Sequence, residues 1–266
     1  MKKFALIGEK LGHSYSKIIH ERYFELSGKK EYTYDLIEIP KEELEKEFLR
    51  ISKEYDGINV TIPYKLDVIK YLDSISPEAE KIGAVNTIVF KNGKAFGYNT
   101  DYFGFKYLLE TNYIEIKDKD VVILGTGGAS KAALAVCEDM GASEVSFVTT
   151  KSVPCGNYKT LNYNDKIKGD VLVNCTPVGM YPKTDVSPLN ELDLSFNAVV
   201  DMIYNPSVTK LMQQGILNGI KSVNGLYMLV AQAVKAQVVW NSEDFDKYIT
   251  DKIYSELKCF IYRDKN

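Results

Sequence analysis

The sequence has few of the residues that build metal centres and disulfide frameworks. It contains 4 cysteines and 2 histidines among 266 residues, and no two cysteines form a CxxC pair. An HExxH motif is also missing, so no pattern predicts a zinc site. Cysteines spaced this far apart are typical of reduced thiols, and we therefore expect a cytoplasmic protein without disulfides.

Long apolar runs and blocks of one charge are missing as well. No stretch approaches the roughly 18 consecutive apolar residues of a membrane span. The 33 basic and 36 acidic residues are scattered and give a net charge of −3. This distribution provides no basic surface for nucleic acid or anionic lipid, so we expect neither as a partner. A small-molecule substrate is the expected partner, and the choice between monomer and homodimer stays open.

Short apolar runs alternate with amphipathic stretches in the first third of the chain. Strand-like runs at 4–7, 32–39 and 57–62 are separated by helical patterns at 16–26 and 41–52. Further on, the Lys91-Asn92-Gly93 turn between two apolar runs predicts a hairpin. Alternation of this kind is typical of α/β layers with a mainly parallel sheet.

A second α/β unit begins near residue 102. Its strand-like runs fall at 120–124, 145–149, 170–174 and 198–202. Two helical patterns follow at 227–240 and 245–260, with no strand after them. The simplest layout is two α/β units with a helical tail that returns to the first.

A glycine-rich turn follows the first strand of this second unit. Gly125, Gly127 and Gly128 lie between an apolar strand pattern and an alanine-rich helical pattern. Glycine lets the backbone approach a pyrophosphate, and a helix N-terminus offers free N–H groups and a positive dipole end. Ser130 stands where the motif usually has glycine or alanine, a mild departure. The strand–turn–helix context predicts dinucleotide binding rather than a merely structural turn.

The end of the next strand bears on which dinucleotide is bound. An NAD site usually has an acidic residue there that holds the ribose hydroxyls. Here the chain reads Thr149-Thr150-Lys151, and no acid occurs from 145 to 164. Hydroxyls and a cation suit the 2′-phosphate of NADP, so we expect NADP as cofactor, with NAD possible. The alternative is that Lys151 is an ordinary solvated loop residue.

Three polar clusters lie at strand ends in the first unit. They occur at 12–16, at 57–65, and at 84–87 together with 97–101. Ligands of open α/β sheets bind at the carboxyl ends of strands. These clusters supply hydroxyls, amides and a cation, which is the mixture that a polyol carboxylate needs.

Oxidation of a secondary alcohol requires a group that takes up the hydroxyl proton. His20 falls within a helical pattern and is interpreted as structural, and His13 has no carboxylate near it in sequence. Lys65 with Asp101 is therefore the best candidate pair for proton transfer. Lysine is normally cationic at neutral pH. Two roles stay open for Lys65: a base made neutral by burial, or a cation that stabilises the developing alkoxide.

Eight segments together resemble the shikimate dehydrogenase family in order and spacing. They are GHSYS at 12–16, GINVTIPYK at 57–65, AVNT at 84–87, GYNTD at 97–101, GTGGAS at 125–130, NCTPVGM at 174–180, DMIYNP at 201–206 and GLYMLVAQA at 225–233. The resemblance covers about residues 5–240. It implies an NADP-dependent oxidoreductase that interconverts shikimate and 3-dehydroshikimate by hydride transfer, on the pathway to chorismate and the aromatic amino acids.

The resemblance also implies roles for matched positions, with Lys65 and Asp101 as the catalytic pair. Ser14 and Ser16 would contact the substrate carboxylate, and Tyr204 would reach the substrate from the cofactor side. The positions implied to contact ring hydroxyls are Thr61, Asn86 and Gln232. Those implied to hold the cofactor are Gly125, Gly127, Gly128 and Ala129 at the pyrophosphate, and Met202 and Gly225 at the nicotinamide.

The fold that the resemblance implies is divided. An N-terminal α/β substrate domain, residues 1–101, would be completed by C-terminal helices in residues 226–266. A central Rossmann-like dinucleotide-binding domain would occupy residues 102–225. This arrangement accounts for the helical tail without a strand.

The sequence departs from the family pattern at two places. Lys17 and Glu21 replace a usual proline and asparagine on the first helix, where we expect little cost to the chemistry. The usual Asn-Arg-Thr after the second cofactor strand is Thr149-Thr150-Lys151. Because lysine lacks the bidentate fork of arginine, we expect weaker NADP binding or tolerance of NAD.

Three functions other than shikimate dehydrogenase are compatible with parts of the sequence. A quinate or dual quinate/shikimate dehydrogenase shares nearly every motif, and the missing arginine is compatible with it. A methylenetetrahydrofolate dehydrogenase would also use a lysine but lacks the GHSxS and NVTIPYK segments. A non-catalytic nucleotide-sensing regulator on the same fold predicts loss of Lys65 or Asp101, and both are present.

Overall fold

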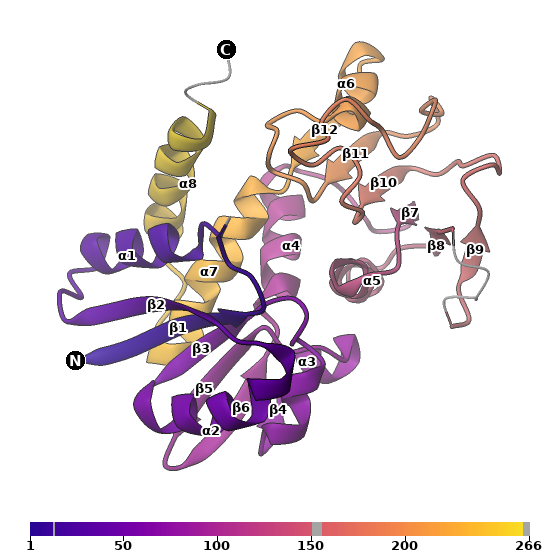
Figure 1. Cartoon of the computed structure of the whole chain (residues 1–266). Helices are drawn as coiled ribbons and strands as arrows, with labels where there is room; N and C mark the ends of the chain where they lie inside the picture. The colour runs from indigo at the N-terminus through magenta and orange to yellow at the C-terminus, as the bar shows by residue number, and fades with distance from the viewer. Residues whose placement is uncertain (13, 151–155, 263–266) are drawn as a thin grey trace. The chain divides into compact units, whose positions relative to one another are not determined.

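The computed structural model describes residues 1–12, 14–150 and 156–262 (Figure 1). The chain divides into two compact units, Met1–Gly104 with Val230–Cys259, and Phe105–Leu229 with Phe260–Asn266. Each unit is built on one six-stranded sheet. The α/β fold class expected from the alternating pattern is confirmed.

The sheet of the first unit has the order β2-β1-β3-β5-β6-β4. Its strands are β1 (Lys2–Gly8), β2 (Tyr32–Glu38), β3 (Gly57–Val60), β4 (Ser74–Ile75), β5 (Thr87–Lys91) and β6 (Lys94–Tyr98). β1 pairs in parallel with β2 and β3, whereas β5 is antiparallel to both β3 and β6. Asn92 and Gly93 have φ values of 53° and 73°, as the tight turn of a predicted hairpin requires. The sheet is mainly parallel, as predicted, and of its six strands only β5 runs in the opposite direction, because this hairpin reverses the chain.

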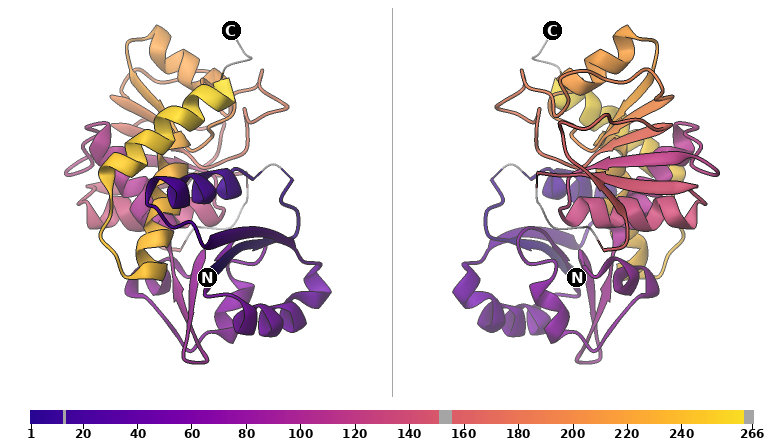
Figure 2. Two further views of the ribbon diagram at one scale, coloured as in Figure 1. Left: turned by 90° about the vertical axis from the view of Figure 1, so that its left-hand side faces the viewer. Right: turned by 90° about the vertical axis from the view of Figure 1, so that its right-hand side faces the viewer.

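Helices cover both faces of this sheet (Figure 2). They are α1 (Ser16–Leu26), α2 (Leu44–Glu54), α3 (Pro77–Ile82), the start of α4 (Thr100–Thr111), most of α7 (Leu226–Asn241) and most of α8 (Lys247–Tyr262), with short 3-10 turns η1 (Lys41–Glu43) and η2 (Asp67–Tyr71). On one face, Phe48 and Ile51 of α2 pack into a core with Ile58 of β3. Apolar residues spaced by three or four place this stripe of α2 toward the sheet.

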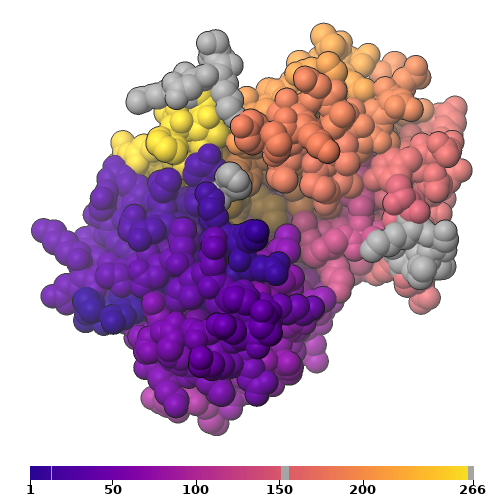
Figure 3. Space-filling view, viewed as in Figure 1, coloured from indigo at the N-terminus to yellow at the C-terminus, as the bar shows by residue number. Residues whose placement is uncertain are grey.

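The other face is closed by α1 and α7, so that an N-terminal and a C-terminal segment of the chain pack together in the first unit. Trp240 of α7 stacks on Phe4 of β1 with ring centroids 4.5 Å apart, and its indole N–H donates to the carbonyl of Ile88 at 2.9 Å. Arg22 Nε donates to Glu256 of α8 at 2.7 Å. In Figure 3 the indigo N-terminal and yellow C-terminal segments accordingly lie side by side on the surface.

The sheet of the second unit is entirely parallel, in the order β12-β11-β10-β7-β8-β9. Its strands are β7 (Asp120–Leu124), β8 (Glu144–Val148), β9 (Lys159–Leu161), β10 (Val171–Asn174), β11 (Ala198–Asp201) and β12 (Lys221–Asn224), with helices α5 (Gly128–Asp139) and α6 (Lys210–Leu217). The order reverses between β7 and β10, as in a doubly wound dinucleotide-binding fold. Ligands bind at the carboxyl ends of the strands beside such a reversal.

His20 is buried beneath α7 and is held in its neutral form. Gln237 Oε1 accepts from Asn241 at 3.2 Å, so its Nε2 faces His20 Nδ1 at 2.7 Å. Nδ1 must then be an acceptor without a proton. Burial lowers the pKa of His20 from 6.5 to about 3, with a smaller opposing effect from a hydrogen bond with Asn59. The interpretation of His20 as a structural residue agrees with this environment.

We expect the first unit to lose stability in acid because of His20. The unfolded chain takes up a proton below pH 6.5, whereas the folded chain does so only near pH 3. The contribution of His20 to the free energy of unfolding is complete above pH 6.5. It falls by about 1.4 kcal/mol per pH unit as the pH decreases from 6.5 toward 3. Urea unfolding of wild type and His20→Gln at pH 7, 6 and 5 checks this. An equally steep pH dependence in both proteins would assign the effect to another group.

Candidate active site

The topology of the first sheet gathers the predicted substrate residues at one edge. β1, β3 and β6 run in the same direction, so their carboxyl ends share an edge, and β5 begins at that edge. The predicted residues that follow or precede these strands are Ser14 and Ser16 after β1, Thr61 and Lys65 after β3, Asn86 before β5, and Asp101 after β6.

Lys65 and Asp101 form a close pair at this edge. Lys65 Nζ lies 2.6 Å from Asp101 Oδ2, and the two side chains are 24% and 17% exposed. Partial burial reduces the screening of such a pair by water. Lys65 can therefore be held at a fixed position while its ammonium still reaches a ligand.

The start of α4 fixes the position of Asp101. Asn99 Oδ1 accepts from the backbone N–H groups of Asp101 at 3.1 Å and Tyr102 at 3.4 Å, which caps the helix. Asn99 Nδ2 donates to the carbonyl of Ala84 at 2.9 Å. Asn99 had no predicted role of its own, although an Asn-Thr-Asp sequence before a helical pattern is a recognisable capping signal.

Asn86 belongs to a buried polar network beside this pair. Its Oδ1 accepts from Thr100 N–H at 2.7 Å and from the Thr87 hydroxyl at 3.0 Å, so its Nδ2 points away from these donors. The Thr100 hydroxyl also lies 3.5 Å from Gln232 Oε1 on α7. Asn59 Nδ2 donates to Thr87 Oγ1 at 3.0 Å. The structure thus joins Asn86 and Gln232 through Thr100, and Thr87 and Thr100 are supporting residues to which the sequence assigned no role of their own.

The two serines and the threonine of the expected substrate set lie after β1 and β3. Ser14 Oγ accepts from Ser16 N–H at 3.2 Å at the start of α1. The methyl group of Thr61 would lie 2.7 Å from a Cβ at Gly8, so only glycine lets these two strand ends approach so closely. Ser14, Ser16 and Thr61 therefore share the edge that carries Lys65.

The glycine turn of the second unit leaves room for a ligand against its backbone. Gly125 has φ of 90°, which favours glycine, and α5 begins at Gly128 with Gly127 as its N-cap. A Cβ at Gly127 or Gly128 would have no atom within 4 Å. The first turn of α5, which includes Ala129, holds no acidic residue. Free N–H groups and open space beside them suit a pyrophosphate.

The residues expected at the 2′-phosphate follow β8. Thr149 is buried, and its N–H donates to the carbonyl of Leu161 at 3.0 Å. Thr150 is exposed. Lys151 lies outside the described residues, so its expected contact stays a prediction.

The residues expected at the nicotinamide lie at the same edge as the glycine turn. Met202 follows β11, and its N–H donates to the carbonyl of Asn174 at 3.0 Å. A Cβ at Gly225 would lie only 2.1 Å from the carbonyl oxygen of Met202. The carbonyl of Tyr204 accepts from the Tyr262 hydroxyl at 2.6 Å. Tyr204 belongs to the second unit, unlike the other expected substrate residues.

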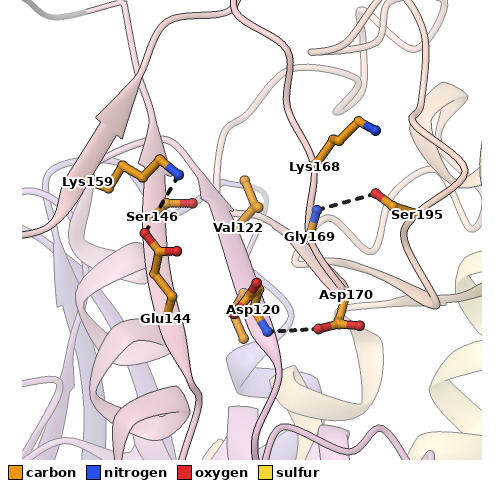
Figure 4. Close-up of a pocket in the computed structure, with 10 residues that line it drawn as sticks. Asp120, Val122, Glu144, Ser146, Lys159, Lys168, Gly169, Asp170 and Ser195 are labelled. Carbon is orange, nitrogen blue, oxygen red and sulfur yellow. Dashed lines mark hydrogen bonds and ion pairs between the residues drawn. The ribbon is translucent and has the colours of Figure 1, made fainter.

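A groove of about 400 Å³ lies at the opposite, amino-terminal edge of the second sheet (Figure 4). Its charged side chains form ion pairs or hydrogen bonds with one another or with residues nearby. Lys159 lies 3.7 Å from Glu144, and Lys168 lies 3.8 Å from Asp193. Asp170 accepts from the N–H of Asp120 at 2.9 Å. Because these charges already have partners and the glycine turn is at the other edge, the groove is not assigned to substrate or cofactor.

Neither a metal centre nor a membrane span is found in the described residues, 1–12, 14–150 and 156–262. No group of three or more histidine, cysteine, aspartate or glutamate side chains is arranged to hold a metal ion there. Within the same ranges, no helix has the length and apolar character needed to cross a membrane.

Comparison with known proteins identifies the family. A model of the shikimate dehydrogenase substrate binding domain matches residues 6–88. A shikimate dehydrogenase (NADP(+)) from Clostridium beijerinckii is 44% identical over 96% of this chain and 97% of its own length.

Solved structures agree with the sequence comparison. A chorismate mutase/shikimate 5-dehydrogenase fusion protein from Clostridium acetobutylicum matches with a TM-score of 0.93 at 43% identity, covering 98% of each chain. A shikimate 5-dehydrogenase from Thermus thermophilus, in complex with NADP(H) and shikimate, matches with a TM-score of 0.86 at 29% identity, covering 96% of this chain and 99% of the other. The similarity extends over nearly the whole chain in each case, and this chain belongs to the shikimate dehydrogenase family.

Proposed function

We propose that this chain is an NADP-dependent shikimate dehydrogenase, which interconverts shikimate and 3-dehydroshikimate. The observation that carries the proposal is the Lys65–Asp101 pair, 2.6 Å apart at the sheet edge where Asn86 and the predicted hydroxyl residues gather. A pair of this kind provides proton transfer, and the surrounding amides and hydroxyls suit a carboxylate with several ring hydroxyls. The family membership and the NADP(H)–shikimate complex of the Thermus thermophilus relative support the choice of substrate and cofactor.

The two units take different parts in this proposal. The first, with proposed bounds 1–101 and 226–266, binds the substrate, and the second, proposed as 102–225, binds NADP. In the first unit, Ser14 and Ser16 contact the carboxylate, while Thr61, Asn86 and Gln232 contact the ring hydroxyls. Tyr204 is also proposed to contact the substrate.

The cofactor contacts are proposed within the second unit alone. The backbone at Gly125, Gly127, Gly128 and Ala129 holds the pyrophosphate, and the space beside Gly127 and Gly128 supports this. Thr149, Thr150 and Lys151 face the 2′-phosphate. Met202 and Gly225 line the nicotinamide.

The chemistry of the chain's own residues follows from the geometry of the pair. Bound NADPH supplies the hydride that reduces the ketone carbon, and NADP⁺ accepts it in the reverse direction. Lys65, as an ammonium, donates a proton to the ketone oxygen as that carbon is reduced, and regains one from the hydroxyl on oxidation. Asp101 holds Nζ in place and compensates its charge. Asn86 turns its Nδ2 away from Thr100, and this donor orients a ring oxygen.

A direct assay tests the function. Purified protein is mixed with shikimate or quinate and with NADP⁺ or NAD⁺, and reduced nicotinamide is followed by absorbance. We expect the highest kcat/KM for shikimate with NADP⁺. A preference for quinate would make the chain a quinate dehydrogenase with the same catalytic pair, and no turnover with any combination would favour the nucleotide-sensing regulator.

Replacement of Lys151 by alanine is expected to weaken the binding of NADP⁺ more than the binding of NAD⁺. The two cofactors differ only in the 2′-phosphate, and Lys151 is the one cation in the Thr149-Thr150-Lys151 segment that replaces the family's usual arginine-containing one. Loss of a charge-assisted contact raises KM for NADP⁺ by roughly tenfold. Thr150→Ala is the matched control, because it removes a hydroxyl without removing charge. Equal effects of Lys151→Ala on both cofactors would remove Lys151 from the phosphate site.

A further inference from the structure

Asp201 is a buried carboxylate to which neither the sequence nor the proposed chemistry assigns a role. It is 0% exposed at the end of β11. Its Oδ1 accepts from Asn174 Nδ2 at 3.0 Å and from the N–H of Ile203 at 3.1 Å, and its Oδ2 accepts from the Thr209 hydroxyl at 2.6 Å. Within the described part of the chain its donors are all neutral. Burial raises the pKa of Asp201 to about 6, against the opposing effect of these hydrogen bonds.

A carboxylate in this position is costly for stability. An ionised group that leaves water without a cationic partner destabilises the fold, even where hydrogen bonds offset part of the cost. An apolar residue of similar size would avoid the penalty. The geometry around Asp201 therefore needs an explanation beyond packing.

On one side, Asp201 is linked to the glycine turn through Asn174. The amide of Asn174 is oriented by its partners, because Oδ1 accepts from the Thr176 N–H at 3.0 Å and from the Thr176 hydroxyl at 2.7 Å. Only Nδ2 then faces Asp201. The methyl group of Thr176 would lie 2.9 Å from a Cβ at Gly125. The loop after β10 is thus held directly against the turn that is proposed to bind the pyrophosphate.

On the other side, Asp201 fixes the segment proposed to line the nicotinamide. Its carboxylate holds the N–H of Ile203, and the carbonyl of Ile203 accepts from Gly225 N–H at 3.1 Å. The N–H of Met202 is bound by the carbonyl of Asn174. Asp201 and Asn174 together therefore determine where the backbone from Met202 to Tyr204 lies.

We propose that Asp201 is a positioning residue of the dinucleotide site, joining the glycine turn to the Met202–Tyr204 segment through Asn174 and the Ile203 N–H. This inference rests on the proposed NADP site, of which it names a further determinant. Asp201 acts through other residues and touches neither substrate nor cofactor. Its loss should therefore affect the nicotinamide end of the cofactor more than the adenosine end.

The test compares Asp201→Asn with wild type in two binding measurements and one kinetic measurement. Asparagine keeps the shape but places an NH₂ against Ile203 N–H and Asn174 Nδ2, or against the Thr209 hydroxyl. We expect kcat/KM for NADP⁺ to fall about 10- to 100-fold, the scale of losing hydrogen bonds to a charged group. By calorimetry, affinity for NADP⁺ should fall while affinity for adenosine 2′,5′-bisphosphate, which lacks the nicotinamide and the pyrophosphate, stays within about twofold.

Two further variants test the same link between Asp201 and the cofactor site. Asn174→Ala should reproduce the pattern, and the double variant should lose less than the sum of the two changes, because the residues act through one contact. If Asp201→Asn does not fold, Asn174→Ala alone tests the link. Thr209→Val removes the hydroxyl on Oδ2 and the cap of α6. It should lower the melting temperature without changing kcat.

Specific outcomes would overturn the inference. Unchanged NADP⁺ affinity and kinetics in folded Asp201→Asn would show that the carboxylate positions nothing. A parallel loss of adenosine 2′,5′-bisphosphate affinity would indicate general damage to the unit. If wild type bound NADP⁺ but did not oxidise shikimate, the proposed function would fail, while the two binding measurements would still decide the role of Asp201.

Discussion

Replacement of Lys65 by methionine is expected to lower kcat for shikimate oxidation by roughly 10²–10⁴-fold, the usual scale for losing a general acid–base group. Methionine is nearly as long as lysine and apolar, so the change removes the ammonium while filling most of the same space. Asp101, 17% exposed, would then lose the cation 2.6 Å from its carboxylate. Initial rates of NADP⁺ reduction at saturating shikimate measure the effect.

Two controls separate chemistry from folding in this experiment. Lys46→Met removes an exposed lysine on α2 of the same unit and should leave kcat unchanged. The affinity of Lys65→Met for NADP⁺ should also match wild type, because the proposed cofactor contacts belong to the second unit. Near-wild-type turnover in Lys65→Met would take Lys65 out of the mechanism.

Burial on both faces explains which strands of the second unit could be predicted. The apolar run at 120–124 coincides with β7, and the run at 170–174 contains β10, because central parallel strands are apolar throughout. β9 and β12 are the two outer strands of the sheet, and their sequences KTL and KSVN are polar and partly exposed. Such an edge strand has no apolar run in its sequence, and neither β9 nor β12 was predicted.

Short helices were missed for a different reason. α3 spans only Pro77–Ile82, which is less than two turns and too short to show a period. Its ends nevertheless carry signals, since the Ser76 side chain accepts from Ala79 N–H and Gly83 adopts a left-handed φ of 67°. Capping residues are the better guide for helices of this length.

The candidate catalytic pair could be named from the sequence because few residues can transfer a proton, but its contact could not be derived. Lys65 and Asp101 are 36 residues apart and meet only because β3, β5 and β6 pair as they do. The buried residues that support Asn86 are harder to predict from the sequence. Thr87 and Thr100 were visible as polar residues at strand ends, yet the hydrogen bond from the Thr100 N–H to Asn86 depends on a tertiary contact.

Replacement of Gly225 by alanine is expected to damage the cofactor site through a direct clash. The new methyl group would lie 2.1 Å from the carbonyl oxygen and 2.6 Å from the carbonyl carbon of Met202, and both are backbone atoms. The Met202–Tyr204 segment must shift, and overpacking of this kind costs about 1–3 kcal/mol. We expect a lower melting temperature and, since Met202 is proposed to line the nicotinamide, a rise in KM for NADP⁺ of roughly 10- to 100-fold.

Gly127→Ala is the informative comparison, because its methyl group meets no atom within 4 Å and its φ of −85° suits alanine. The folded chain should tolerate this change, so the melting temperature without ligand should stay close to that of wild type. The same methyl group would occupy the space in which a pyrophosphate approaches the backbone, so NADP⁺ binding should still weaken. Melting curves with and without NADP⁺ distinguish the two variants. If Gly127→Ala kept full NADP⁺ affinity, the glycine turn would be structural and the cofactor would have to be bound elsewhere.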